Sequence, residues 1–518
     1  MAQIRQTNPR TGIVYVYEAE PFWDKDRKQS RYLHRTMIGH IDPDTGELVP
    51  NRPTKPKTSA PAASRLFAGA TYLLSQVATQ IGLDQDLARA VGEPASQAVL
   101  SFAQFLICHD PAPASRFPLW ARTHVHAYEP ELTSQRLSEL FASINQDNLE
   151  AFFSARVKRA GDDYWFFDIT SISSYSRLLE KVRWGHNKDG MPLPQINLAI
   201  VKDAATGLPL VFKDLPGNIT DVTLVKQLLA DFAHFGVGKT KLCMDRGFYS
   251  QTNIDLLMDG HQKFLIGART GVTYVKQAIT EHAHYLRSWE HYNPDRHLFG
   301  LRLDHPWEST LENKTKRAYL HLYFDTRRAN DDEETFGRLI EQYYHELVSG
   351  HLVAEHQSGY DKYFHKTGKS WAGNDQAIEA ERARYGYFAL LSNDATLDCW
   401  QALDIYRSKD QIEKAFHDIK DRLDMRTTTV HNQETLTGKL FTVFASLILT
   451  SELRRRMTTS GLSHDYTLTE LLDQLETIEQ YQQPGHKPEI LHVTAKQAEI
   501  YSRLNIQPPP TTSQHSGN

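Results

Sequence analysis

Cysteine is scarce in this chain, which has three in 518 residues: Cys108, Cys243 and Cys399. They lie far apart, and no CxxC pair or Cys/His ligand spacing surrounds them. The sequence therefore indicates neither a disulfide framework nor a structural zinc site. A reducing compartment suits such a chain.

Long apolar runs are also missing. No uninterrupted stretch of about 18 apolar residues, the length that spans a bilayer, occurs in the sequence. The first residues, MAQIRQTNPR, contain no apolar segment of the kind found in signal peptides. We therefore expect a cytoplasmic protein with no membrane partner.

Positive charge is not in excess, because the formal net charge is −5. Proteins that simply coat nucleic acid are strongly basic, so any binding to DNA would depend on local clusters of charge. One such cluster near the start contains Arg27, Lys28, Arg31 and Arg35. The acidic run Asp331–Glu334 is interpreted as a solvated loop.

The composition is that of an ordinary globular protein, with 40% hydrophobic and 23% charged residues. A chain of 518 residues is too long for one compact core, so we expect roughly two to four domains. No internal repeat is visible.

The first third of the chain divides into three segments. Apolar and polar residues alternate over 11–40 and a turn, IDPDTGEL, follows, which predicts an N-terminal β arm at 1–50. The Pro- and Lys-rich segment at 51–61 is the expected linker. Apolar residues then recur at three and four spacing, which predicts a helical domain over 62–160.

The pattern changes after residue 160. YWFFDIT, QINLAIV and LPLVFKDL are strand-like, and they precede the helical DVTLVKQLLADFAHF, the strand KLCMD, the helix NIDLLMDG and the strand KFLIGA. Three strands followed by helix, strand, helix and strand is the order of an RNase H-like α/β core. We assign the first part of this core to 161–268.

The rest of the chain is expected to complete the core around an insertion. TGVTYVK, HLFGLRL and RAYLHLYFD read as strands and FGRLIEQYYHELVSGH as a helix, which predicts a β-rich subdomain at 269–388. GYFALLSND, the long amphipathic helix WQALDIYRSKDQIEKAFHDIKDRL and the apolar, buried helix KLFTVFASLILTSELRRRM form the second part of the core, at 389–456. A helical region at 457–505 and a disordered tail at 506–518 follow.

Two acidic residues end apolar strands in the predicted core. Asp168 closes YWFFD, and Asp245 closes KLCMD before Arg246 and Gly247. Each acid alone is more simply explained as a cap or a solvated strand end. Strand ends of one α/β sheet converge on a crevice, however, so the two together resemble a metal site.

A third acid, Glu413, lies on the predicted long helix. At about 100° per residue it shares a stripe with Tyr406, Lys409, His417 and Lys420, beside an apolar stripe that can pack on a sheet. A mixture of Glu and Lys is also the ordinary pattern of helix-stabilising pairs, so this alternative stays open. A single helical histidine such as His417 is more often structural.

The segment YRSKDQIEKAFHDIK contains a known spacing: Tyr, two residues, a basic residue, three residues, Glu, six residues, Lys. With YWFFDIT, LPGNITD and MDRGFYS, it makes the chain from about 160 to 450 resemble bacterial DDE-class insertion-sequence transposases. The resemblance is to the IS-four superfamily, whose helix carries this Y-R-E-K signature. Tyr406, Glu413 and Lys420 match in type and spacing, whereas Lys409 stands at the arginine position and Arg407 lies two residues earlier.

The resemblance implies a magnesium-dependent enzyme, with Mn²⁺ as a substitute, in which Asp168, Asp245 and Glu413 are the catalytic and metal-binding residues. Asp168 would bridge two ions, and the other two acids would each anchor one. A pair of ions about 3.5 to 4 Å apart can activate water and stabilise the leaving oxygen of a phosphodiester. Magnesium prefers such carboxylate ligands. The same site would cut element ends and join the freed 3′-hydroxyl to target DNA.

The resemblance also implies partners: double-stranded DNA with terminal inverted repeats, target DNA, and a second copy in a homodimer on paired ends. Tyr406, Arg407, Lys409 and Lys420 would contact DNA. The β arm and the helical domain would recognise element ends, and the protein would be bacterial and nucleoid-associated when bound. In the insertion, Trp289, Trp307 or Trp371 could stack a flipped base, although core aromatics are the simpler interpretation.

Three other functions remain open. A structure-selective nuclease or resolvase of the same fold would share the acids but would need neither the Y-R-E-K helix nor the insertion. A glycoside hydrolase would use two carboxylates without metal, and nothing in the chain indicates a cleft of stacked aromatics. A transposase-derived DNA-binding protein without activity is the alternative outside the enzymes, against which all three acids are present.

Overall fold

A computed structural model describes residues 2–9, 11–24, 29–50, 64–109, 113–219, 221–311, 313–368, 370–423, 425–428, 430, 432–483 and 485–511. The chain divides into two compact units, Met1–Ser64 with Tyr481–Pro488 and Arg65–Gln480 with Glu489–Asn518. The linker expected at 51–61 lies outside the described residues, as do Arg27 and Lys28.

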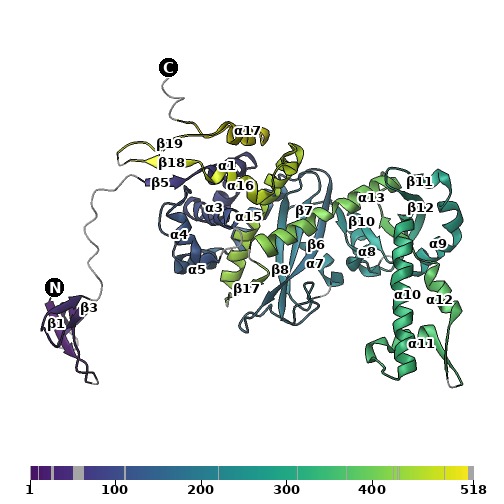
Figure 1. The fold of residues 1–518 in the computed structure, drawn as a ribbon, viewed down its shortest axis with the longest axis horizontal. Coiled ribbons are helices and arrows are strands. Elements are labelled where there is room, and N and C mark those ends of the chain that lie inside the picture. Colours follow the sequence, from purple (N-terminus) through teal and green to yellow (C-terminus); the bar gives the residue numbers. More distant parts are fainter. Residues whose placement is uncertain are drawn as a thin grey trace, which may run out of the picture. The chain divides into compact units, whose positions relative to one another are not determined.

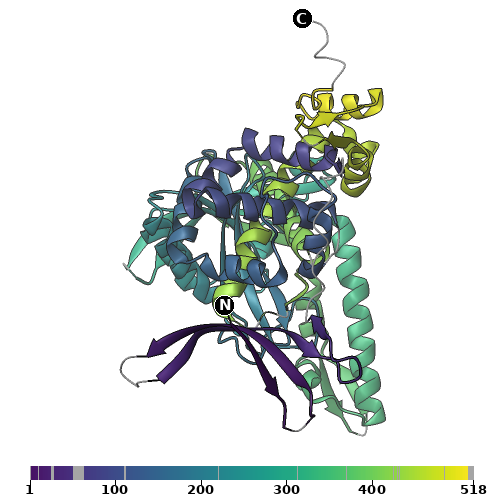
Figure 2. The same ribbon diagram turned by 90° about the vertical axis from the view of Figure 1, so that its left-hand side faces the viewer.

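The first unit contains an antiparallel sheet, drawn in purple in Figure 1 and Figure 2, whose four strands follow one another in chain order. The β structure expected at 11–40 is present as the pair β2 and β3, which bend at two register shifts. Arg35, one of the basic residues of the arm, is exposed and its guanidinium lies 3.8 Å from the ring centroid of Tyr17. The strands are β1 (Ala2–Thr7), β2 (Val14–Asp24), β3 (Gln29–Ile41) and β4 (Leu48–Pro50).

The N-terminal helices of the second unit pack against a buried helix from much later in the chain, α15 (Gln433–Thr459) (Figure 1). A Cβ added to Gly438 would lie 2.0 Å from the carbonyl oxygen of Phe141, so the backbones of α5 and α15 approach each other closely. The prediction of a buried apolar helix here is confirmed. The other helices of this layer are α1 (Gly69–Gln80), α2 (Leu83–Val91), α3 (Glu93–Cys108), α4 (Phe117–Ala121), α5 (Ser134–Ser143) and α6 (Gln146–Val157).

Among the described residues, α15 is the one helix whose length and composition would allow it to cross a membrane. However, 89% of its most apolar window is buried inside the protein. A core helix passes the same test of length and composition, so α15 is weak evidence for a membrane span.

The second unit is centred on a mixed sheet of ten strands among the described residues, in the order β11-β12-β13-β16-β10-β9-β6-β7-β8, with β17 paired to β6. β6, β9 and β10 are parallel, and β7 is antiparallel to its neighbours β6 and β8. Along the chain this half of the sheet has the order third, second, first, fourth, fifth with an antiparallel second strand, the arrangement of an RNase H-like core. Its elements are β6 (Tyr164–Ser174), β7 (Gln195–Asp203), β8 (Pro209–Pro216), α7 (Asp221–His234), β9 (Lys241–Met244), α8 (Gln251–Asp259) and β10 (Lys263–Ala268).

The range 269–388 contains both helices and strands. Its strands β12 and β13 extend the large sheet through β16, while α10 leads away from the sheet with α11 and α12 beside it (Figure 1). That this range acts as an inserted subdomain stays a prediction. The elements are α9 (Thr273–Leu286), β11 (Tyr292–Asn293), β12 (Leu298–Ser309), β13 (Lys314–Phe324), α10 (Thr326–Ser349), α11 (Gln357–Tyr363), β14 (Phe364–Thr367), β15 (Ser370–Gly373) and α12 (Asp375–Arg382). β16 (Tyr387–Ser392) starts at the end of this range and lies mostly in the second part of the expected core.

Two local predictions in this range are wrong. TGVTYVK is mostly helical, in α9, because Val275, Ala278 and Ile279 continue into a three-and-four apolar pattern that buries one face. The acidic run Asp331–Glu334 is not a loop but part of α10, where Glu333 pairs with Arg382 at 2.9 Å. Packing of one helical face overrides the local β-propensity and the local charge.

The tail expected to be disordered at 506–518 is ordered in its described part, up to Thr511. Ile506 is 4% exposed, and Thr511 forms a β-bridge with Ile490. The prediction is wrong there because it relied on the proline-rich composition and overlooked the apolar Ile506. The remaining elements near this end are β17 (Thr427–Thr428), α16 (Leu468–Glu476), β18 (Glu479–Gln482), β19 (Glu489–Ile490) and α17 (Ala495–Arg503), with β18 pairing β5 (Ser64–Phe67).

Candidate active site

Two central parallel strands bring Asp168 and Asp245 side by side. The register pairs Phe167 of β6 with Met244 of β9, so the acid that follows each residue occupies the next position. Asp245 directly follows β9, as predicted. Asp168 does not end its strand, which continues to Ser174 because ITSISS keeps pairing with β7.

The helix expected to carry the third acid is interrupted at Lys409. α13 (Cys399–Ser408) and α14 (Asp410–His417) flank this residue, and a π-helical turn, Asp418–Arg422, follows. At the break the Ile412 amide donates to the Lys409 carbonyl at 2.8 Å, a three-residue spacing that tightens the backbone. The single long helix predicted from the sequence is therefore two helices and a widened turn.

The break lets the Lys409 ammonium lie among the predicted acids. Its Nζ is 3.8 Å from Oδ2 of Asp168 and 3.5 Å from Oε1 of Glu413, and it also interacts electrostatically with Asp245. The Lys409 side chain is 6% exposed, whereas that of Glu413 is 64% exposed. Three carboxylates from β6, β9 and α14 thus share one buried cation.

These charges shift the pKa values of the site. Burial raises the pKa of Asp168, and the ammonium groups of Lys188 and Lys409 offset this only in part. For Asp245 burial also favours the neutral form, but Lys409 and a Tyr406 hydrogen bond leave the pKa lowered. Burial opposes the charge of Lys409, yet the carboxylates raise its pKa, so it stays an ammonium.

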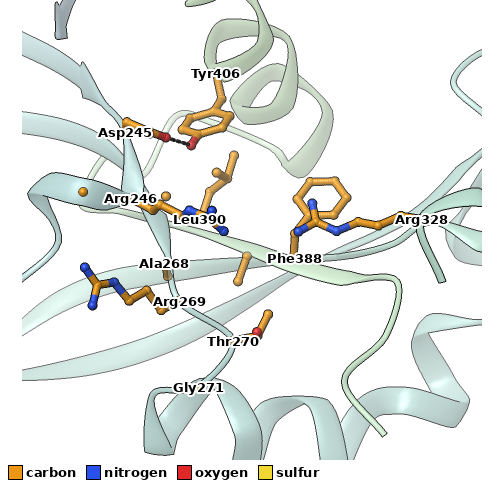
Figure 3. Close-up of a pocket in the computed structure, with 13 residues that line it drawn as sticks. Asp245, Arg246, Ala268, Arg269, Thr270, Gly271, Arg328, Phe388, Leu390 and Tyr406 are labelled. Atoms are coloured by element: carbon orange, nitrogen blue, oxygen red, sulfur yellow. Dashed lines mark hydrogen bonds between the residues drawn. The ribbon is translucent and has the colours of Figure 1, made fainter. Parts of the chain in front are cut away.

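Tyr406, on the last turns of α13, orients the second acid by donating its hydroxyl to Oδ1 of Asp245 at 2.8 Å (Figure 3). Gly267 of β10 makes room for this contact, because a Cβ there would lie 2.7 Å from the Tyr406 oxygen.

Asp245 and Tyr406 line a cleft of about 880 Å³ beside the acids. Arg246, Arg269 and Arg328 also line it, and the Arg328 guanidinium lies 5.4 Å from the ring centroid of Phe388 (Figure 3). All three arginines are exposed, so the cleft presents cations to solvent next to the carboxylates. Such a surface suits a phosphate backbone.

The other residues of the predicted signature have different surroundings. Arg407 is exposed on α13. Lys420 is 8% exposed and donates to both carboxylate oxygens of Asp189, at 2.8 and 2.9 Å. His417 is exposed and paired with Asp421.

Of the three tryptophans considered for base stacking, Trp307 is buried and its Nε1 donates to Asp255 at 2.7 Å. Trp371 packs against the small apolar cluster around Phe336, Tyr343 and Tyr360. Trp289 is 79% exposed.

Several residues of the site were not singled out from the sequence. Lys188 reaches Asp168 at 3.7 Å from the connection between β6 and β7, and neighbouring Asp189 holds Lys420. That connection has no periodic pattern, so only the KD pair in WGHNKDG could have marked it. Arg269 and Arg328 come from segments far apart in sequence, and only folding brings them to one cleft.

The donor set suits a hard divalent cation, because carboxylate oxygens are the ligands that such ions prefer. The carboxylates already have one positive charge beside them, the ammonium of Lys409. Within the described ranges, however, no group of three His, Cys, Asp or Glu side chains is arranged to hold a metal ion. A divalent cation held by the same carboxylates would compete with Lys409 for them.

Comparison with known protein families shows which family the chain belongs to. The family model described as "Transposase DDE domain" matches residues 159–449, which include all three acids. The chain belongs to the DDE transposases. This family consists of nuclease and transferase enzymes of DNA transposition, and the matched range runs from just before β6 into α15.

The transposase is also similar to a solved structure, that of the piggyBac transposase synaptic complex with hairpin DNA. The match covers 79% of this chain and 76% of that chain, with 10% sequence identity and a TM-score of 0.38. The curated proteins contain no match to this transposase.

Proposed function

We propose that this transposase cleaves DNA at the ends of a mobile element and transfers the 3′-hydroxyl ends to target DNA, with Asp168, Asp245 and Glu413 as its catalytic carboxylates. The observation that supports this most is the convergence of the three acids on one buried ammonium, Lys409, from three separate elements. Asp168 is buried and Asp245 is half-buried, and holding such carboxylates near one another is costly unless a cation lies between them.

We propose Mg²⁺ as the cofactor, with Mn²⁺ as a substitute, held by these three carboxylates. A bound pair of such ions would supply an activated water or 3′-hydroxyl and would stabilise negative charge on the phosphate. Tyr406 would keep Asp245 oriented through its 2.8 Å hydrogen bond. Lys409, once withdrawn from the acids, would be free to contact a DNA phosphate.

The DNA would lie in the arginine-lined cleft beside Asp245. Arg246, Arg269 and Arg328, which line this cleft, would contact phosphates and set the position of the strand without reading its sequence. Arg407 is exposed and available for the same role. Lys420 would support the site indirectly, because its ion pair holds Asp189 in position.

The finer assignment is to the IS-four superfamily through the Y-R-E-K spacing of Tyr406, Lys409, Glu413 and Lys420. The placement of Lys409 and Tyr406 at the acids supports it. We further propose terminal inverted repeats as the substrate and a homodimer on paired ends.

The test is cleavage of duplex DNA that carries the sequences flanking the gene. The unaltered protein is compared with Asp168→Asn, Asp245→Asn and Glu413→Gln, and with Asp410→Asn as a matched control on the same helix. Asp410 is exposed on α14, so its variant should cut normally.

Cleavage at the element boundary that needs Mg²⁺ or Mn²⁺, is lost in the three acid variants and persists in Asp410→Asn would support the proposal. Binding of these ends by the unaltered protein without any cleavage would favour a DNA-binding protein that has lost activity. Cleavage of branched DNA irrespective of sequence would favour a structure-selective nuclease.

A further inference from the structure

A second cavity lies on the opposite side of helix α14 from Glu413. It has a volume of about 910 Å³ and is bounded by the end of β7, by α14, by the C-terminal end of α15 and by the start of α16. Gln411, Ala415 and Asp418 line it, and at about 100° per residue these positions are about 120° to 180° around the helix from Lys409 and Glu413. No described residue lines both this cavity and the cleft beside Asp245.

A buried cation, Lys202, forms part of its wall, and we call the cavity the Lys202 pocket. Lys202 is 6% exposed, and its Nζ donates to the backbone carbonyl of Gln411 at 3.1 Å. This is the one hydrogen bond of that ammonium recorded among the described residues, although an ammonium can donate three. Donor capacity is therefore left over in a buried group that faces a cavity.

Asp418, the acid that interacts with Lys202, does not accept a hydrogen bond from it among the described residues. Asp418 interacts electrostatically with Lys202, but its two carboxylate oxygens accept hydrogen bonds from Arg454 at 3.1 and 2.7 Å. Burial, with Lys414 and Arg454 nearby, lowers the pKa of Lys202 to about 8. A buried cation with spare donor capacity is stabilised by an anion that enters the cavity.

The rest of the pocket lining is also predominantly cationic. Cationic side chains outnumber acidic ones, and threonine and serine hydroxyls add neutral donors. The cations are Lys202, Lys414, Arg422, Arg454 and Arg455, and the acids are Asp418, Asp465 and Glu470. Arg455 also pairs with Glu452 at 2.8 Å, so part of its charge is already balanced.

The shape favours a chain of phosphates over a single ion. A cavity of about 340 Å³ adjoins the pocket and shares Ala205, Thr206 and Arg455 with it. Arg156 and Arg159 line this extension, where both are paired with Asp86, and Glu452 lines it as well, so the excess of cations lies in the Lys202 pocket. Together the two cavities offer more room than one phosphate group requires.

We propose that the Lys202 pocket binds the phosphodiester backbone of a DNA strand outside the segment that enters the acid site. Lys202 and Arg454 contact the phosphates inside the pocket, and Lys414 contacts them at its exposed rim. Helix α14 then has a DNA strand on each side, with Glu413 facing one and Lys414 the other. The proposal does not require that the three acids be catalytic.

Binding of a fluorescein-labelled ten-nucleotide thymidylate strand to the full-length protein, without divalent ions, tests this. Lys202→Met removes the buried charge at nearly constant length, and Lys414→Glu reverses the rim charge at an exposed position where folding is not at risk. Lys226→Glu is the matched control, since Lys226 is exposed on α7 and does not line the pocket. Thermal unfolding shows whether Lys202→Met is folded.

We expect Lys202→Met and Lys414→Glu each to weaken binding on the order of tenfold, and Lys226→Glu to leave it unchanged within about twofold. Equal affinities in the unaltered protein and Lys414→Glu would overturn the proposal, even if Lys202→Met does not fold. Binding of inorganic pyrophosphate is measured in a separate experiment. If it binds in a manner that depends on Lys202 while strand affinity does not, the pocket takes free phosphates and the strand proposal is also overturned.

These outcomes are independent of the cleavage test. Loss of boundary cleavage in the acid variants concerns the proposed activity alone, because those variants leave the Lys202 pocket unaltered. A strand-binding defect in Lys414→Glu concerns the pocket alone.

Discussion

Lys409 is the buried cation of the candidate site. Its ammonium lies 3.5 to 3.8 Å from oxygens of Glu413 and Asp168, and it is shielded from solvent. An arginine at this position, as the signature has, would be longer and planar, and would reach past the acids more readily. The lysine instead acts as a counterion for them, so DNA and metal binding should be coupled through its position.

The variant Lys409→Met should bind Mn²⁺ more tightly than the unaltered protein, by about tenfold, because an ammonium and a divalent cation compete for the same carboxylate oxygens. Calorimetric titration of the protein without DNA measures this affinity. Lys420→Met is the control, since Lys420 pairs with Asp189 and not with the three acids. Weaker Mn²⁺ binding in Lys409→Met would show that the lysine does not compete with the metal.

His321 of β13 should make the protein sensitive to acid. It is buried, neither ring nitrogen has a hydrogen-bond partner among the described residues, and burial lowers its pKa from 6.5 to about 4. Below pH 6.5 the unfolded chain takes up a proton that the folded protein takes up only near pH 4. Stability contributed by the neutral ring is therefore lost as pH falls through this window.

Replacing the ring by His321→Phe should remove this loss. Between pH 7 and pH 4.5 the unfolding free energy of the unaltered protein should fall by about 2 to 3 kcal/mol more than that of the variant. Urea unfolding at the two pH values gives the comparison. The exposed His345 provides a control, because His345→Phe should follow the unaltered protein; equal pH dependence in His321→Phe would refute the assignment.

At the scale of elements, the break between α13 and α14 and the π-helical turn after α14 determine the directions of the Lys409 and Lys420 side chains. A uniform rotation of about 100° per residue places Tyr406, Glu413 and Lys420 on one stripe. The tight turn at Lys409 and the π-helical turn at Asp418–Arg422 change that rotation. Lys409 is thereby directed to the acids, and Lys420 to Asp189.

Two glycines should show how differently helices α15 and α10 are packed. Gly438→Ala should destabilise the protein by about 3 kcal/mol, because the new Cβ would lie 2.0 Å from the Phe141 carbonyl oxygen, a backbone atom of α5. Gly337→Ala, on the exposed face of α10 with nothing within 4 Å of the new Cβ, should stabilise it by about 1 kcal/mol. Denaturant midpoints compare the two, and a destabilising effect of Gly337→Ala would contradict the exposed placement of this helix face.

At the scale of the whole molecule, a net charge of −5 means that DNA binding depends on a few local cation clusters. The arginines of the cleft beside Asp245 form one such cluster. A cation that contacts a phosphate releases a bound counterion, so each contact adds about one to the slope of log affinity against log salt concentration.

Arg246→Gln, Arg269→Gln and Arg328→Gln should each lower that slope by about one for duplex DNA. The measurement is the affinity at four or five salt concentrations. Arg338→Gln is the matched control, because Arg338 lies on exposed α10, is paired with Glu334 and does not line the cleft. If the salt-dependence slope is the same in all four variants, the DNA does not bind in the cleft beside Asp245.

Much of the core was predictable because its signals are local. Alternating or continuous apolar runs indicated β6 to β10, and their order along the chain indicated the RNase H-like arrangement. Helix α15 was predicted from its apolar length. The strand TGVTYVK and the acidic loop were wrong because a burial pattern that extends beyond each short segment determines the helix there.

The sequence by itself determined the order of strands and helices from β6 to β10, the positions of Asp168, Asp245 and Glu413 along the chain, and a charge too low for general coating of DNA. Only the tertiary structure decided that Lys409 lies among those acids, that Lys188 lies beside Asp168, that Arg328 lines the cleft beside Asp245, and that Lys202 lines a second, basic cavity. Periodicity follows from local backbone geometry and can be read from neighbouring residues. Charge contacts between distant segments depend on how strands pair and where a helix breaks, which no local pattern contains.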